Sequence, residues 1–174
     1  VHDLSLLDAW TAASPATIHA VGLRGFGNAP TPHAQLTLTY PGGALASIIV
    51  SWIAPAKQRC VVLGFDRHTI IWDDLVAGSS VQLFNRGVAP VPDPSRRRQP
   101  QSIVEHVPVP SAEPLAKAVG HFVDCIASRT PPRSGASAGL RTVQLLEAAD
   151  RSLAGGLAVV FGSPIPAPVP MRVA

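Results

Sequence analysis

The fold is decided by residues 34–53, AQLTLTYPGGALASIIVSWI. Residues 34–40 alternate apolar and polar side chains, which is the period of a β-strand with one buried face. The Pro-Gly-Gly sequence of residues 41–43 favours a turn, and residues 44–53 predict a second strand. The two segments therefore form an antiparallel β-hairpin. Because the second strand is apolar on both sides, we expect both of its faces to be covered.

Further strands are predicted on both sides of this hairpin. Their connections are short, with a tight Asp66-Arg67 turn between two of them, and this spacing is typical of an antiparallel meander. The predicted strands are residues 17–26, 59–65, 68–73 and 80–86, an edge strand at 103–109 and a last strand at 157–161. Pro108 restricts the 103–109 segment to an edge, since proline cannot donate to a ladder of hydrogen bonds.

Three segments have helical spacing of apolar residues: 3–13, 114–128 and 137–154, the last with Ser137 as N-cap and Gly155-Gly156 as its end. We predict an α+β fold with an open, mainly antiparallel β-sheet of about six strands and helices packed on one face. The helices at 114–128 and 137–154 can cover only one face of such a sheet. We therefore expect a second copy of the chain or another domain on the other face.

Residues 1–160 are predicted to form one α+β domain, and residues 161–174 a proline-rich tail. Residues 88–102 are interpreted as a surface loop that contains the basic run Arg96-Arg97-Arg98.

Composition excludes several classes of protein. Charged residues are 14% of the chain, below the ~25% typical of soluble domains, which also favours a covered surface. The basic residues are not interleaved with aromatic ones, which argues against nucleic-acid binding, and no apolar run is long enough to span a membrane. Cys60 and Cys125 lack the spacing of a zinc site, so we expect free, buried thiols and a cytoplasmic protein.

Five blocks in one order carry a family resemblance. They are His2-Asp3-Leu4-x-Leu6-Leu7, Ser51-Trp52-Ile53-x-Pro55-x-Lys57-x-Arg59, Trp72-Asp73-Asp74-Leu75, Glu113-Pro114-Leu115 with His121-Phe122-x-Asp124-Cys125-Ile126, and Gly139-Leu140-Arg141-x-Val143-x-x-Leu146-Glu147-Ala148-Ala149. Over residues 1–156 the chain resembles the C-terminal half of the Gfo/Idh/MocA oxidoreductases. It is most similar to members that act on nucleotide-linked or free amino sugars.

The resemblance implies a two-domain parent enzyme. In that family an N-terminal Rossmann domain binds NAD(P), while the open sheet of the C-terminal domain supports the sugar site and makes oligomer contacts. We therefore expect the substrate-binding and oligomerisation domain of an NAD(P)-dependent oxidoreductase acting on a sugar, amino sugar or polyol. Its partners would be further copies, through the open face of the sheet, and the missing Rossmann domain. A chain that begins at Val1 within an apolar-periodic segment fits a piece of a longer protein.

The cofactor, NAD or NADP, is expected on the absent domain and not on this chain. The sequence has neither the GxGxxG that cradles a pyrophosphate nor the Glu-Lys-Pro of the family. The chain alone is therefore predicted to be inactive. The alternatives are a stand-alone sugar-binding or assembly module without redox activity, and a cofactor-independent enzyme.

His2 is the predicted catalytic residue of the parent enzyme, because it matches the family's histidine and because an imidazole can accept the proton that an oxidised alcohol loses. In the isolated chain the alternative is a terminal histidine that is merely exposed to solvent. The family's aspartate would precede residue 1, and Ser5 occupies an often acidic position. Trp52, Lys57 and Arg59 are the predicted substrate-binding residues. The two basic side chains suit sugar hydroxyls or phosphate, although an ordinary charged turn is the alternative.

No metal site is predicted. Asp73 and Asp74 are interpreted as turn residues, since no further ligands stand at suitable spacing. His121 and Asp124, one helical turn apart, are interpreted as a pair on a helix surface.

Overall fold

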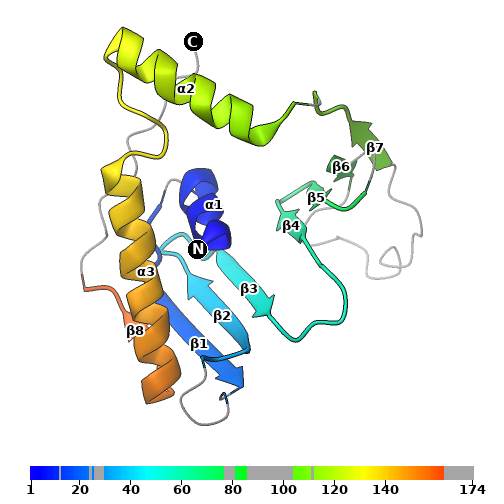
Figure 1. The fold of residues 1–174 in the computed structure, drawn as a ribbon. Coiled ribbons are helices and arrows are strands. Elements are labelled where there is room, and N and C mark those ends of the chain that lie inside the picture. Colours follow the sequence, from blue (N-terminus) through cyan, green and yellow to red (C-terminus); the bar gives the residue numbers. More distant parts are fainter. Residues whose placement is uncertain are drawn as a thin grey trace. The chain divides into compact units, whose positions relative to one another are not determined.

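The computed structural model describes residues 1–11, 13–23, 25, 30–76, 81–85, 104–110 and 112–162 (Figure 1). These residues form two compact units. The first comprises Val1–Ala54 with His121–Ala174, and the second comprises Pro55–Gly120. The predicted loop at 88–102 and most of the predicted tail lie outside the described residues. In the described part of the chain, no helix is long and apolar enough to cross a membrane.

The first unit contains a four-stranded antiparallel sheet in the order β3-β2-β1-β8. The strands are β1 (Thr17–Leu23), β2 (His33–Thr39), β3 (Leu45–Ser51) and β8 (Val159–Val160). The predicted hairpin is confirmed as β2 and β3. The Tyr40 N–H donates to the Ala44 carbonyl at 3.0 Å, and Gly43 adopts a φ of 81°, which favours glycine.

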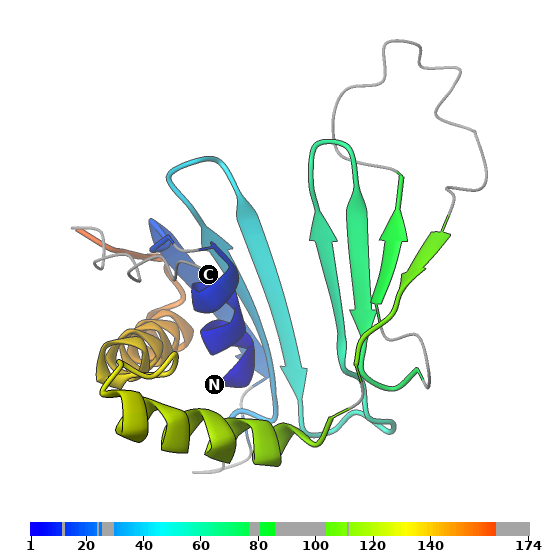
Figure 2. The ribbon, with the colours of Figure 1, turned by 90° about the horizontal axis from the view of Figure 1, so that it is seen from above.

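Helices α1 (His2–Thr11) and α3 (Ala136–Gly155) lie on the same face of this sheet (Figures 1 and 2). The alternation of β2 explains the arrangement: Leu36 and Leu38 point to the helices and are buried, while Gln35 and Thr37 point away. The core consists of Leu4, Ile18, Ala20, Ala34, Leu36, Leu38, Tyr40, Ile48, Leu145, Ala148 and Ala149. Helix packing on one face is thus confirmed for this sheet.

Helix α3 ends as predicted but begins differently. Gly156 caps its C-terminus in the left-handed conformation, with a φ of 67°. The N-cap is Gly135 and not the predicted Ser137, because the helix starts at Ala136 and places Ser137 inside the first turn. Near the other end, the buried Ser152 hydroxyl accepts from the Ala20 N–H at 2.8 Å and donates to the Leu157 carbonyl at 2.6 Å. This hydroxyl therefore ties α3 to β1.

The second unit contains another antiparallel sheet, in the order β4-β5-β6-β7. The strands are β4 (Cys60–Gly64), β5 (Thr69–Asp73), β6 (Val81–Phe84) and β7 (Val104–Val107). Strand β7 is an edge strand, as its following proline predicted. The α+β class with open antiparallel sheets is confirmed, but the described strands form two sheets of four and not one of about six. Periodicity identifies strands, whereas it does not show which strands pair.

Helix α2 (Pro114–Ser128) has the predicted bounds. The Glu113 carboxylate caps it by accepting from the Leu115 N–H at 3.0 Å and from the Ala116 N–H. Its apolar stripe is exposed, with Leu115 68% and Phe122 61% accessible, and Cys125 is its only buried residue. The expectation that this helix covers a sheet is therefore not met in the structure.

Both cysteines are free, as expected. Cys125 is buried, but Cys60 is exposed, which corrects the expectation of two buried thiols.

Candidate functional site

The candidate site is built on α1, which carries His2 at its first position. His2 is exposed, and its carbonyl accepts from the Ser5 hydroxyl at 2.8 Å. Leu4 and Asp8, one turn apart, are the buried residues of this helix. The position of His2 therefore depends on what Leu4 and Asp8 contact.

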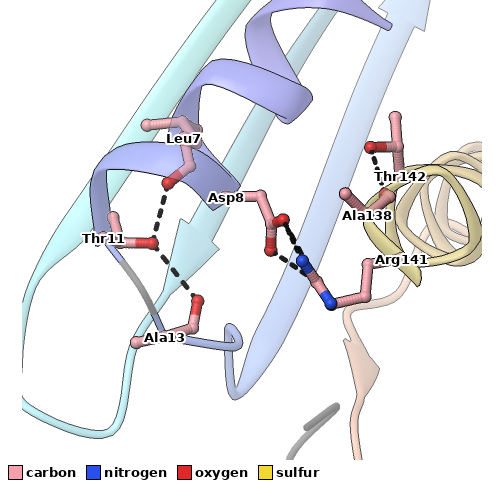
Figure 3. Close-up of polar contacts among 7 residues, drawn as sticks. All are labelled: Leu7, Asp8, Thr11, Ala13, Ala138, Arg141 and Thr142. Atoms are coloured by element: carbon pink, nitrogen blue, oxygen red, sulfur yellow. Dashed lines mark hydrogen bonds and ion pairs between the residues drawn. The ribbon is translucent and has the colours of Figure 1, made fainter. Parts of the chain in front are cut away.

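Asp8 forms a bidentate ion pair with Arg141 of α3 (Figure 3). Arg141 Nη2 lies 2.8 Å from Asp8 Oδ2, and Arg141 Nε lies 3.0 Å from Asp8 Oδ1. The two side chains are only 8% and 9% exposed, for Arg141 and Asp8 respectively. The planar guanidinium matches both carboxylate oxygens. The pair therefore fixes both the distance between α1 and α3 and the rotation of α1 about its own axis.

Tyr40 directly follows β2 and is buried in the core of the same unit as Asp8. Burial raises the pKa of its phenol, the hydrogen bond with Thr11 lowers it, and the negative charge of Asp8 raises it further. The net direction is upward from the ordinary value of 10.0. The Thr11 hydroxyl donates to the Leu7 carbonyl at 2.8 Å, and the Ala13 carbonyl lies 3.2 Å from the same oxygen as an alternative acceptor (Figure 3). The last turn of α1 is thus held by polar contacts.

Sequence reasoning missed Asp8, although a signal was present. Asp8 stands four residues after Leu4, on the face of the helix that carries the apolar residues. A carboxylate on a buried face requires a cationic partner, and Arg141 lies on the buried face of α3. A search for opposite charges on two apolar helix faces would have found the pair.

The predicted substrate residues are divided between the two units. Trp52 directly follows β3 in the first unit and is 91% exposed, although its backbone N–H is held by the Pro32 carbonyl at 2.8 Å. Lys57 and Arg59 lie in the second unit and are exposed. Arg59 Nη1 forms an ion pair with Asp74 Oδ2 at 3.0 Å. The structure therefore shows Arg59 already engaged, which favours the charged-turn interpretation for that residue.

The acidic residues behave as turn residues. The Asp73 carboxylate accepts from the Leu75 N–H at 2.9 Å, which is an Asx turn after β5. No group of three or more metal-ligating side chains occurs among the described residues. In the same part of the chain, His121 contacts Cys125 and the backbone of Arg133, so its predicted pairing with Asp124 is not the contact that forms.

Comparison with known proteins gives matches among solved structures alone. No family model matches the sequence, and no curated protein matches it. UDP-N-acetylglucosamine 3-dehydrogenase from Acidithiobacillus ferrooxidans is 20% identical with a TM-score of 0.72, over 88% of this chain and 45% of that one. Aldose-aldose oxidoreductase from Caulobacter crescentus is 16% identical with a TM-score of 0.70, over 92% and 45%.

A third match is an oxidoreductase from Agrobacterium radiobacter, crystallised with NAD⁺, L-tartaric acid and magnesium. It is 18% identical with a TM-score of 0.60, over 84% of this chain and 43% of that one. This chain has the fold of part of a Gfo/Idh/MocA-type oxidoreductase. It spans less than half the length of the solved proteins to which it is similar. The fold that the resemblance implied is therefore confirmed.

Proposed function

We propose that this chain is the substrate-binding and oligomerisation part of an NAD(P)-dependent oxidoreductase that acts on a sugar, amino sugar or polyol. The proposal rests on the fold match. Two proteins named for sugar chemistry match 88% and 92% of this chain. The free thiols of Cys60 and Cys125 support a reducing compartment, so we place the protein in the cytoplasm.

We infer that the described residues of this chain do not hold the cofactor. A pyrophosphate needs glycines at a strand-to-helix turn, so that backbone N–H groups can approach it. Among the described glycines, a Cβ on Gly22 would meet Leu153 of α3 at 3.0 Å and the His33 carbonyl at 2.9 Å, so this glycine serves packing. Gly43 and Gly156 serve a turn and a helix cap. We therefore assign the NAD(P) site to another domain.

Three exposed side chains of this chain are the proposed contacts to the sugar substrate. Trp52 offers a broad apolar surface of the kind against which a sugar ring packs, and the exposed Lys57 supplies a cation for hydroxyl or phosphate oxygens. His2, at the start of α1, would accept the proton of the hydroxyl that is oxidised. Arg59 is a weaker candidate for substrate binding, because Asp74 already satisfies its charge.

Changing Trp52 to alanine should weaken sugar binding by roughly tenfold or more, as expected when an aromatic anchor is removed. The measurement is thermal stabilisation of the chain by UDP-N-acetylglucosamine, free amino sugars and polyols, titrated to saturation. Trp10→Ala is the matched control, since Trp10 is a partly exposed tryptophan on α1 and should leave the affinity unchanged. Equal losses in both variants, or saturable binding of NAD⁺ to this chain, would contradict the proposal.

The length of the native polypeptide, measured by immunoblotting with an antibody against this chain, distinguishes the proposed enzyme part from a stand-alone sugar-binding or assembly module. The proposal expects a native polypeptide roughly twice as long, since this chain matches 45% of the solved proteins. A native product of 174 residues would favour the stand-alone module.

The open face of the first sheet is the proposed contact with a second copy. Opposite the helices, it exposes Val21, Leu23, Leu45 and Ile49, which are 50–67% accessible. The register places Val21 and Ile49 in one row, with Gln35 between them. The apolar side chains of β1 and β3 therefore stand on either side of the polar open face of β2, and a second copy that covers this face would bury both groups.

Changing Ile49 to arginine should therefore raise the dissociation constant of the oligomer by roughly tenfold or more, because a charge would enter the contact. Light scattering over a dilution series measures this effect. Leu157→Arg is the control, because Leu157 is 74% exposed but does not belong to the sheet. A wild-type chain that is monomeric at all concentrations would contradict the contact.

A further inference from the structure

The imidazole of His121 joins helix α2 to the connector, residues 129–135, that leads to α3. The backbone N–H of Arg133 donates to His121 Nε2 at 3.1 Å. On the other side, Cys125 Sγ lies 3.6 Å from Nε2 and 3.8 Å from Nδ1 of the same ring. Cys125 is buried and His121 is half-buried. The ring is thus held between its own helix and the connector.

The direction of the hydrogen bond fixes the protonation state of the ring. A backbone N–H can only donate, so Nε2 must offer its lone pair, and the neutral ring carries its proton on Nδ1. Protonation makes both ring nitrogens donors, which removes the acceptor and sets two N–H groups against each other. We infer that His121 is a proton-sensitive latch, which holds the connector when neutral and releases it when protonated. This device is independent of the proposed function.

The connector has few other hydrogen bonds that could replace the latch. The Thr130 N–H donates to the Cys125 carbonyl at 3.1 Å and attaches the start of the connector to α2. Pro131 and Pro132 follow and have no N–H to donate. Arg133 is therefore the next donor, and His121 is its acceptor. The latch thus sets the path of the chain from the end of α2 to the start of α3.

The charges around the ring act in both directions. Within the described residues, the titratable and charged groups on the two segments that hold the ring are Lys117, Asp124 and Cys125 on α2, and Arg129 and Arg133 in the connector. A positive ring is attracted by Asp124 and repelled by the cations, so these charges oppose one another, and the loss of the hydrogen bond is what favours release. We therefore expect protonation of the ring on acidification to release the connector.

Amide hydrogen exchange of the whole chain, followed by NMR at pH 8 and pH 5, tests the latch. After correction for the intrinsic exchange rate, the Arg133 amide should be protected roughly fivefold less at pH 5, the factor expected for one lost hydrogen bond. The Gly156 amide is the internal control, because it donates to the Ser152 carbonyl, which does not titrate in this range. Its corrected protection should be the same at both pH values.

The His121→Gln variant keeps an acceptor oxygen without a titrating group, so its Arg133 protection should no longer depend on pH. The nitrogen chemical shifts of His121 in the unmodified chain give a second readout, which does not require a variant to fold. They should show the proton on Nδ1 at pH 8. Equal Arg133 protection at pH 5 and pH 8, or a neutral ring protonated on Nε2, overturns the inference.

Discussion

Replacing Arg141 with methionine should lower the free energy of unfolding by about 3–5 kcal/mol, one of the two largest effects expected in this chain. The substitution leaves the Asp8 carboxylate 9% exposed, without the guanidinium that contacts both of its oxygens. A buried charge that has lost its partner retains its full desolvation cost. Urea denaturation followed by circular dichroism measures the loss.

Two variants show whether the effect arises from the unpaired charge. The double variant Asp8→Leu with Arg141→Met removes both charges and should recover most of the stability, because apolar residues can replace a buried pair. Arg59→Met breaks the exposed pair with Asp74, whose side chains are 51% and 38% accessible, and should cost less than about 1 kcal/mol. If Arg141→Met costs no more than Arg59→Met, the buried pair does not hold α1.

The elements of this fold could be predicted well from the sequence. Strand β2 follows from strict alternation, β3 from the apolar run after the Pro-Gly-Gly turn, and α2 from apolar spacing that begins at Pro114. These features are local, since they depend on neighbouring residues and on turn chemistry. The end of α3 was predictable for the same reason, because Gly156 is suited to the left-handed cap.

The features that the sequence did not predict are contacts between residues far apart in the chain. The separation of β3 and β4 into different sheets is a matter of pairing, which alternation does not encode. Arg59 was expected at a substrate and is found with Asp74, 15 residues later. Asp8 and Arg141 are 133 residues apart, and only the packing of α1 on α3 makes them partners.

The family resemblance did predict the fold, although strand pairing could not be read from periodicity. It could do so because it depends on the order of sequence blocks along the whole chain. It proposed roles for His2 and Trp52, but these roles remain predictions until sugar binding is measured. Both residues are exposed in the structure, which is compatible with contact to a substrate.

Shortening Leu38 to alanine should destabilise the first unit by about 2–5 kcal/mol, the second of the two largest effects. Leu38 is fully buried in β2, under helices α1 and α3, and its removal would leave a cavity that neighbouring residues fill only in part. Thermal and urea unfolding monitored by circular dichroism give the loss directly.

Leu45→Ala is the matched control, since it makes the same chemical change on the adjacent strand. Leu45 pairs with Thr39, the neighbour of Leu38, but points to the open face and is 67% exposed. In the dissociated chain its substitution should change the free energy of unfolding by less than about 0.5 kcal/mol. At concentrations where the proposed oligomer forms, it should cost more, because the second copy would then bury it. Equal effects of the two substitutions in the dissociated chain would contradict a sheet covered by helices on one face alone.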